Sequence, residues 1–193
     1  MIIVDARGET CPVPVIMLKK ALKETKDENI REIVDNELAK ENIEKMLKEL
    51  GHSFNSYADG KDYVVEVNLV ESDSPDLNES KKLDDIIVLS SEEMGRGSGE
   101  LGKILMKNFL YALTESDDLP STILMYNSGV KLASENAETI EDLKKLEQRG
   151  VKIMACGLCL NYFGLQEKLQ VGSVTNMYSI VQTKLSAKKL IQI

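Results

Sequence analysis

A single cysteine near the start of the chain stands in a setting that suits a nucleophile. The stretch DARGETCPVP (residues 5–14) places Cys11 directly before two prolines spaced one residue apart. Because a proline at the first helical position loses no hydrogen bond, Pro12 is expected to begin a helix with Pro14 in its first turn. The positive end of the helix then favours the thiolate, and among the first three helical amides only Val13 can donate a hydrogen bond to the sulfur. We therefore expect a rigidly aimed, accessible thiolate that keeps its nucleophilicity, the alternative being a small buried residue.

Two further cysteines occur in the stretch ACGLCLNYFG, at the carboxyl end of an expected strand. A structural zinc site needs four Cys or His ligands, and the single histidine of the chain, His52, lies in the other half of the sequence, so no metal site is expected. Cys156 and Cys159 can instead form a redox or transfer pair, with one thiol attacking and the other resolving. Two small core residues remain the structural alternative.

A glycine-rich stretch, MGRGSGELG (residues 94–102), lies between an expected strand and an expected helix. Its spacing fits GxGxxG, but the first of these glycines follows the strand by several residues, and the next strand ends in YNSG without an acidic residue for a ribose. We expect a turn that caps the helix and leaves the amides of Gly95, Gly97 and Gly99 open to an anion, a persulfide or selenide included. Asn127, at the end of another strand, is expected to line the same crevice.

The first 70 residues read as a small α/β domain that positions Cys11. Apolar periodicity predicts strands at 2–4 and 32–34, helices at 12–24 and 38–50, and a terminal hairpin that turns at the Asp59-Gly60 pair. The order βαβαββ implies a two-layer sandwich with both helices on one face of a mixed sheet.

The second half, residues 86–193, predicts a doubly wound parallel α/β domain. Strands are expected at 86–90, 121–126, 151–156 and 189–193, with helices near 100–113, 138–149 and 175–185. In such a sheet the chemistry gathers at the carboxyl ends of the strands, where both cysteines of this half lie. Between the halves, residues 71–85 are acidic and poor in apolar side chains, and we expect them to form a solvated linker.

Composition narrows the class of protein further. The chain has 193 residues and a formal net charge of −8, which argues against a nucleic acid as main partner. The N-terminus does not resemble a signal peptide, and no apolar run approaches the length of a membrane span. With few cysteines and no secretory signal, we expect a cytoplasmic protein whose thiols act as reagents.

The combination Asp5-x-x-Gly8-x-x-Cys11-Pro12-x-Pro14 at the opening of a βαβαββ domain resembles the TusA/SirA-type sulfur-carrier domain. In that family the cysteine of the CPxP motif carries a persulfide between partner proteins. The resemblance implies that Cys11 is the carrier residue, while Asp5 and Gly8 shape its loop.

Residues 86–193 resemble the DsrE-like sulfur-relay domains, in which a loop cysteine after a central strand accepts sulfur. In that position Cys159 is favoured as the reactive residue, with Cys156 closer to the strand and buried or resolving. The two halves in this order resemble the YedF-type selenium-metabolism proteins. This resemblance implies a sulfurtransferase-like protein that relays a persulfide or selenosulfide from Cys11 to a partner or to Cys156/Cys159, without a separate cofactor.

The same resemblance implies a cysteine desulfurase-like donor, a downstream acceptor protein and oligomerisation through the DsrE-like domain. Two other functions fit the residues. One is a regulatory or scaffold module that binds a small anion or nucleotide in the glycine-rich crevice. The other is a thiol–disulfide reductant that uses Cys156 and Cys159.

Overall fold

The structure is a computed structural model that describes residues 1–10, 12–25, 29–69 and 82–193, so Cys11 lies outside the described residues. The chain divides into two compact units, Met1–Pro75 and Asp76–Ile193. Most of the expected linker, residues 71–81, also lies outside the described part. Its last four residues were wrongly assigned, because strand β5 begins at Lys82 and pairs there with residue Leu119 of the next strand.

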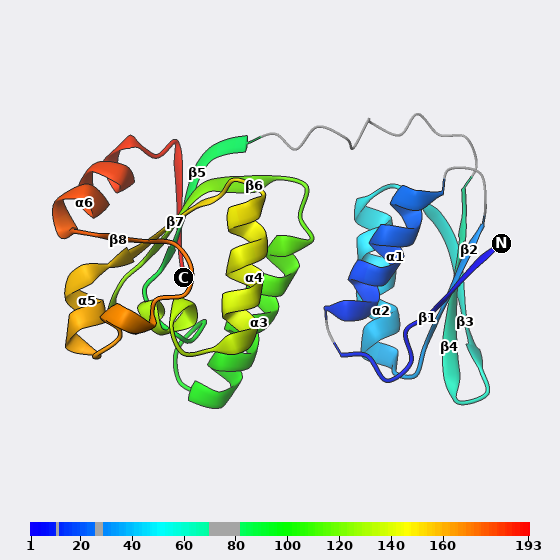
Figure 1. The fold of residues 1–193 in the computed structure, drawn as a ribbon. Helices are drawn as coiled ribbons and strands as arrows, with labels where there is room; N and C mark the ends of the chain where they lie inside the picture. The colour runs from blue at the N-terminus through cyan, green and yellow to red at the C-terminus, as the bar shows by residue number, and fades with distance from the viewer. Residues whose placement is uncertain (11, 26–28, 70–81) are drawn as a thin grey trace. The chain divides into compact units, whose positions relative to one another are not determined.

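The first unit has the expected βαβαββ order (Figure 1). Its sheet runs β1-β2-β4-β3, with β1 parallel to β2 and the other pairs antiparallel, and both helices cover one face. Its elements are β1 (Ile2–Asp5), α1 (Val13–Glu24), β2 (Ile30–Val34), α2 (Glu37–Glu49), β3 (Ser53–Asp59) and β4 (Asp62–Asn68).

The core of this unit lies between the sheet and the two helices. Leu18 of α1 and both Ile43 and Leu47 of α2 are fully buried, and they pack with strand residues of β2 and β4. Asn36 caps α2, because its side-chain oxygen accepts the Ala39 N–H at 2.8 Å. Helix α2 ends at Glu49, so Leu50, expected as the last residue of this helix, follows its last turn and is exposed.

The second unit is built on a sheet in which every pairing is parallel, in the order β8-β7-β6-β5-β9. Helices α3 and α4 lie side by side on one side of it and α6 on the opposite side (Figure 1). Its strands are β5 (Lys82–Leu89), β6 (Leu119–Met125), β7 (Lys152–Cys156), β8 (Ser173–Thr175) and β9 (Lys189–Gln192). Its helices are α3 (Gly99–Thr114), α4 (Ala137–Gln148), α5 (Gly157–Tyr162) and α6 (Met177–Ser186), with the 3₁₀ segments η1 (Asn127–Ala133) and η2 (Gln166–Lys168).

The expected doubly wound fold is confirmed, and the elements that the sequence pattern missed are short. They are η1, α5, η2 and β8, each too short to show a full apolar period. Two of them, η1 and α5, follow directly on the carboxyl ends of β6 and β7, so they shape the edge of the sheet where the cysteines lie. No helix in the described ranges is both long and apolar enough to span a membrane.

A glutamate lies inside the core of the first unit. Glu32 lies on the same face of β2 as the buried residues Ile30 and Val34, and it is itself fully buried. Within the described part of the chain, neither of its carboxylate oxygens has a hydrogen-bond partner. Desolvation raises the pKa of this carboxyl to about 8, so the folded unit holds it protonated at neutral pH.

This burial predicts that the first unit loses stability as the pH rises. The folded state retains a proton that the unfolded chain releases near pH 4.5, so the free energy of unfolding falls between about pH 4.5 and pH 8. The variant Glu32→Leu removes the free-energy cost of burying this carboxyl. It should therefore be more stable than the natural chain above pH 8, by at most about 5 kcal/mol. Urea unfolding followed on the NMR signals of Val4 and Val65, at pH 5 and pH 8.5, measures the difference.

The control is Glu41→Leu, which removes an exposed carboxylate from α2. It should shift the stability equally at both pH values. An equal shift for Glu32→Leu as well would contradict the assignment of a buried, protonated carboxyl.

Candidate functional site

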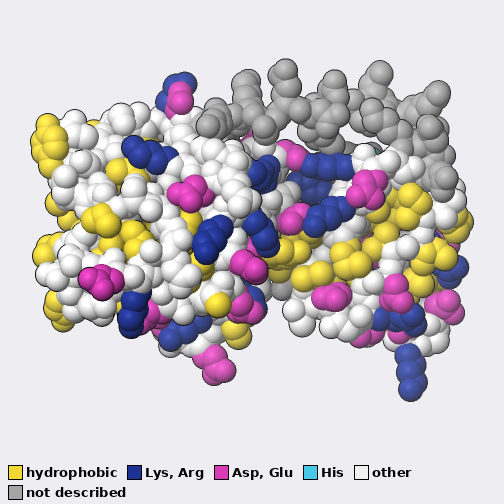
Figure 2. Space-filling view, in the orientation of Figure 1, with side chains coloured by type: hydrophobic (Ala, Val, Ile, Leu, Met, Phe, Trp, Pro, Cys, Tyr) yellow, Lys and Arg dark blue, Asp and Glu magenta, His cyan; other side chains and the backbone are white. Residues whose placement is uncertain are grey.

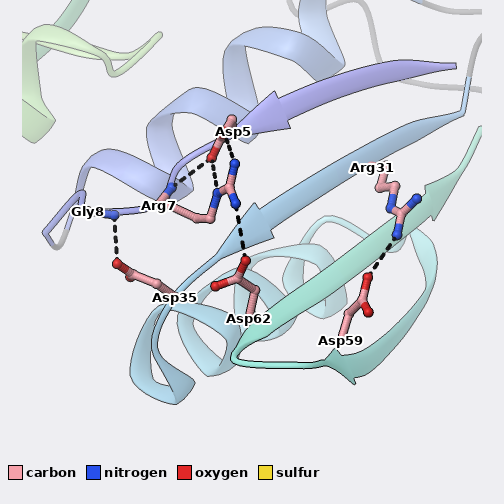
Figure 3. A network of polar contacts seen from close by, with 7 residues as sticks. All are labelled: Asp5, Arg7, Gly8, Arg31, Asp35, Asp59 and Asp62. Atoms are coloured by element: carbon pink, nitrogen blue, oxygen red, sulfur yellow. Dashed lines mark hydrogen bonds and ion pairs between the residues drawn. The ribbon is translucent and has the colours of Figure 1, made fainter.

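The segment that leads to Cys11 is fixed by a network of charged side chains (Figure 3). Arg7 pairs with Asp5 at the end of β1, with 2.6 Å between Nη2 and Oδ2 and 2.9 Å between Nε and Oδ1. Its Nη1 also reaches Oδ2 of Asp62, at the start of β4, at 3.3 Å. The hydrogen bond from the Arg7 side chain lowers the pKa of Asp5 to about 2, so this carboxylate stays charged at neutral pH.

Gly8 is tied to the opposite side of the same loop. Its N–H donates to Oδ2 of Asp35 at 2.8 Å, and the other oxygen of Asp35 accepts the Asn36 side-chain amide at 3.1 Å. These two donors, Asn36 first, lower the pKa of Asp35. Gly8 has φ +80°, a left-handed conformation that favours glycine. The structure therefore brings the predicted pair Asp5 and Gly8 into one network, together with Arg7, Asp35 and Asp62.

The two prolines differ from expectation by one helical position. Pro12 is the N-cap of α1 and Pro14 occupies its second position, where it is buried. The Val13 N–H donates to the carbonyl of Thr10 at 2.9 Å, because the chain turns tightly before the helix. This amide, the one early helical donor that the sequence leaves available to the Cys11 sulfur, is thus bonded within the backbone.

A depression of about 210 Å³ adjoins this segment and the first turns of α1 and α2. Leu38 at its rim is largely exposed, so the depression offers both an apolar side chain and polar groups to a partner. It is lined by Glu9, Thr10, Pro14, Val15, Asn36, Leu38, Ala39 and Asn42.

In the second unit, Cys156 and Cys159 lie together at the carboxyl edge of the parallel sheet. Cys156 is the last residue of β7 and is 1% exposed, whereas Cys159 is partly buried in the first turn of α5. Both are free thiols. Cys159 was expected in a loop, but the chain continues directly from the strand into a short helix, and Gly157 makes this possible. A Cβ on Gly157 would lie 2.9 Å from Cγ1 of Val174 on β8.

A backbone amide from the neighbouring strand end reaches the sulfur of Cys159. The Asn127 N–H donates to Cys159 Sγ at 3.1 Å, and Asn127 has φ +51°, which non-glycine residues adopt infrequently. Two residues on, a Cβ at Gly129 would overlap the Leu89 carbonyl at the end of β5, so η1 packs closely against the sheet edge. Asn127 was predicted to line an anion site, and in the structure its backbone amide donates a hydrogen bond to the Cys159 thiol.

Burial raises the pKa of the Cys159 thiol, and its hydrogen bond with Cys156 raises it further, while the Asn127 amide acts in the opposite direction. At neutral pH this thiol is therefore mainly protonated. Such a sulfur reacts through a small fraction of thiolate, but a thiolate of high pKa is intrinsically a strong nucleophile.

A carboxylate of the protein itself lies beside the glycine-rich stretch. Gly95 and Gly97 are exposed with φ of +85° and +111°. At Gly99, the first residue of α3, a Cβ would lie 3.0 Å from Oε1 of Glu93, and at Gly102 it would lie 2.9 Å from Cβ of that residue. The Glu93 carboxylate therefore lies against Gly99 at the start of α3, and an acidic group is stabilised at a helix N-terminus.

The surface beside Cys156 is apolar. A depression of about 410 Å³ is lined by Cys156, Gly157, Leu158, Val174, Thr175, Asn176 and Met177. Figure 2 shows hydrophobic side chains exposed over α5 and α6. The largest contributors include Leu158, Tyr162, Met177, Tyr178 and Leu185, each more than half exposed. A patch of this size on one face is typical of a surface that binds another protein.

In the part of the chain that the structure describes, no three His, Cys, Asp or Glu residues are grouped as potential ligands of a metal ion. The two candidate sites therefore consist of thiols, backbone amides and the ion pairs that hold them. Sequence reasoning found the thiols but missed Arg7, Asp35 and Asp62. A signal for Arg7 was present in DARG, between two residues already singled out.

Comparison with known proteins separates the two halves. A family model described as sulfurtransferase TusA matches residues 2–68, and one described as the DsrE/DsrF-like family matches residues 98–192. These matches confirm the resemblance of each half, in the same order. The resemblance to YedF-type selenium-metabolism proteins is a finer statement and stays a prediction.

Individual proteins match over parts of the chain. A protein of Thermotoga maritima, named as a candidate sulfur carrier, is 45% identical over 49 residues, which cover 25% of this chain and 62% of that relative. The chain thus spans less than two thirds of that relative. A SirA-like protein of Desulfitobacterium hafniense is 34% identical, with 35% of this chain and 95% of that one covered and a TM-score of 0.33. The ychN protein of E. coli is 14% identical, with coverages of 56% and 98% and a TM-score of 0.43.

The amide at Asn127 gives a test of the site geometry. Asn127→Gly keeps the left-handed conformation and should leave the rate of Cys159 alkylation at pH 8 unchanged. Asn127→Val disfavours that conformation, so the amide should turn away, the pKa of Cys159 should rise and alkylation should slow by roughly threefold to tenfold. Peptide mapping after timed treatment with iodoacetamide measures the rate at Cys159 itself. Equal rates in both variants would mean that the amide does not influence the thiol.

Proposed function

Since residues 2–68 form a TusA-family domain and residues 98–192 a DsrE/DsrF-like domain, we propose that the chain is a cysteine-based carrier of sulfur or selenium. Cys11 accepts the atom as a persulfide or selenosulfide from a cysteine desulfurase-like donor. It then passes the atom to an acceptor protein or to Cys159 in the second unit. The carried atom is cargo, so the proposal needs no separate cofactor, and it places the chain in the cytoplasm, where thiols stay reduced.

The observation that carries the proposal is the hydrogen bond from the Asn127 amide to Cys159 Sγ. In the transfer step the Cys159 thiolate attacks the outer sulfur of a persulfide on Cys11. A bond forms between Cys159 Sγ and that sulfur, the bond to Cys11 Sγ breaks, and Cys11 leaves as a thiolate. The Asn127 amide is positioned to stabilise the negative charge on Cys159 Sγ before the attack.

The first unit contributes a fixed approach to its own cysteine. Arg7 ties the end of β1 to Asp62, and Asp35 ties Gly8 to the start of α2, so the segment before Cys11 is held on two sides. A carrier that must be recognised by two different enzymes benefits from a loop whose shape does not change between them.

The partners we propose are proteins. The net charge of −8 opposes a nucleic-acid backbone, and the exposed apolar side chains of α5 and α6 favour a protein surface, which includes another copy of this chain through the DsrE/DsrF-like unit.

A second function is supported by the placement of Cys156 and Cys159 in the first turn of α5, because a CxxC pair at the start of a helix can also reduce disulfides. By contrast, a module that binds an anion or nucleotide in the glycine-rich crevice is disfavoured by Glu93, whose carboxylate lies against Gly99.

Intact mass analysis after incubation with a cysteine desulfurase and cysteine tests the carrier function. The natural chain should gain sulfur on Cys11, and Cys11→Ser should lose that adduct and nearly all transfer to the second unit. Cys159→Ser is the matched control, because it should keep the adduct on Cys11. Selenocysteine as the donor's substrate tests selenium in the same way.

The results separate the candidates. Absence of an adduct on Cys11 would contradict the carrier function. An adduct confined to Cys11, with no disulfide between Cys156 and Cys159 and no released sulfide, would contradict transfer to Cys159 while leaving the carrier function intact. A disulfide between Cys156 and Cys159 after mild oxidation, with no sulfur or selenium bound anywhere, would support the reductant.

A further inference from the structure

Cys156 is a thiol that the transfer step leaves unused. It is 1% exposed at the end of β7, so a partner protein cannot reach it, yet it is the N-cap of α5 and lies within one helical turn of Cys159. A sulfur atom placed on Cys156 would therefore be out of reach of any acceptor. Its position suits a reaction within the pair.

We propose that Cys156 releases the carried atom from Cys159 as sulfide, or as selenide when selenium is carried; this rests on the proposed acceptance of the atom by Cys159. Cys156 Sγ attacks Cys159 Sγ, the inner sulfur of the persulfide. The bond between the inner and outer sulfur breaks, and its electron pair leaves with the outer sulfur, which takes up the released protons as hydrogen sulfide. The sulfur of Cys156 is oxidised, the outer sulfur is reduced, and a disulfide joins the two cysteines.

The placement of the two cysteines favours attack on the inner sulfur. Cys156 is the N-cap of α5 and Cys159 its third residue, so both lie in one helical turn, and a carried atom extends from Cys159 Sγ by one further bond. Residues with CxxC spacing at the start of a helix are also at the separation at which redox-active disulfides form. Both cysteines have this placement, as the last residue of β7 and the third residue of α5.

Leaving-group chemistry favours the same outcome. Attack on the outer sulfur would expel the Cys159 thiolate, which is a poor leaving group because burial and Cys156 raise the pKa of this thiol. Attack on the inner sulfur expels hydrosulfide, the conjugate base of an acid stronger than an alkyl thiol. The resulting disulfide must then be reduced by an external dithiol before the next atom is accepted.

The test uses the full chain with Cys11→Ser, so that only the second unit is loaded. Glutathione persulfide is added in the absence of oxygen, and the released sulfide is trapped with monobromobimane. The mass of the peptide that contains both cysteines is then measured by mass spectrometry. We expect this chain to release close to one equivalent of sulfide and to lose both thiol hydrogens. With Cys156→Ser added, Cys159 should keep one extra sulfur atom, and sulfide release should fall by at least about tenfold. With Cys159→Ser added, neither product should form.

Each other outcome overturns the proposal in a recognisable way. A stable persulfide on Cys159 in the presence of Cys156, without disulfide or sulfide, would overturn release while leaving the carrier function standing. Sulfur recovered on Cys156 would show onward relay instead. A glutathione adduct on Cys159 in the Cys156→Ser chain would show that the sulfide came directly from the reagent. No sulfur on Cys159 in any variant would overturn both release and the proposed acceptance by this residue.

Discussion

The parallel pairing of β6 with β7 is the constraint on which the chemistry of the second unit depends. Parallel strands end at the same edge of a sheet, so Met125 of β6 pairs with Ala155 of β7, and the residues that follow each strand emerge side by side. Asn127 and Cys159 are far apart in the sequence, and this register brings the amide of one to the sulfur of the other. Gly129, pressed against the Leu89 carbonyl, holds η1 at that edge, and Gly157 lets α5 start beside β8.

In the first unit, charged side chains fix the segment that precedes Cys11. Its reactive segment follows a short strand and precedes a helix whose first turn contains a proline, so few backbone hydrogen bonds are available to fix it. Side chains replace them: Arg7 bridges two carboxylates, and Asp35 accepts from both Gly8 and Asn36. The carboxylates involved keep their charge because their partners lower the pKa of Asp5 and of Asp35. The two units thus orient thiol-bearing segments by different means, ion pairs in one and strand register in the other.

The fold could be predicted from the sequence wherever an element was long enough to show its period. The order of strands and helices in the first unit, and the strands and long helices of the second, followed from apolar patterning, with bounds off by a few residues. The short elements η1 and α5 could not be predicted, because their conformation comes from packing against strand ends rather than from their own residues. For the same reason Cys159 was expected in a loop. The acceptor of the Val13 amide, the Thr10 carbonyl, could not be predicted, because no residue pattern indicates that hydrogen bond. Glu32 lies on the buried face of β2 that alternation indicates, but a charged residue there invites the opposite interpretation.

The contact between Glu93 and the first turn of α3 shows that a single side chain can separate a helix start that is packed by the protein from one that is open to a ligand. Gly99 and Gly102 have no side chains because that space is filled by the aliphatic stem and carboxylate of one glutamate. Internal packing therefore accounts for the spacing of these glycines, although the sequence matches the nucleotide-binding pattern GxGxxG. A related chain with a small residue in place of this glutamate would expose the same helix start to solvent. The side chain at this one position would then determine whether the start of α3 is covered by the protein itself or is open to a ligand.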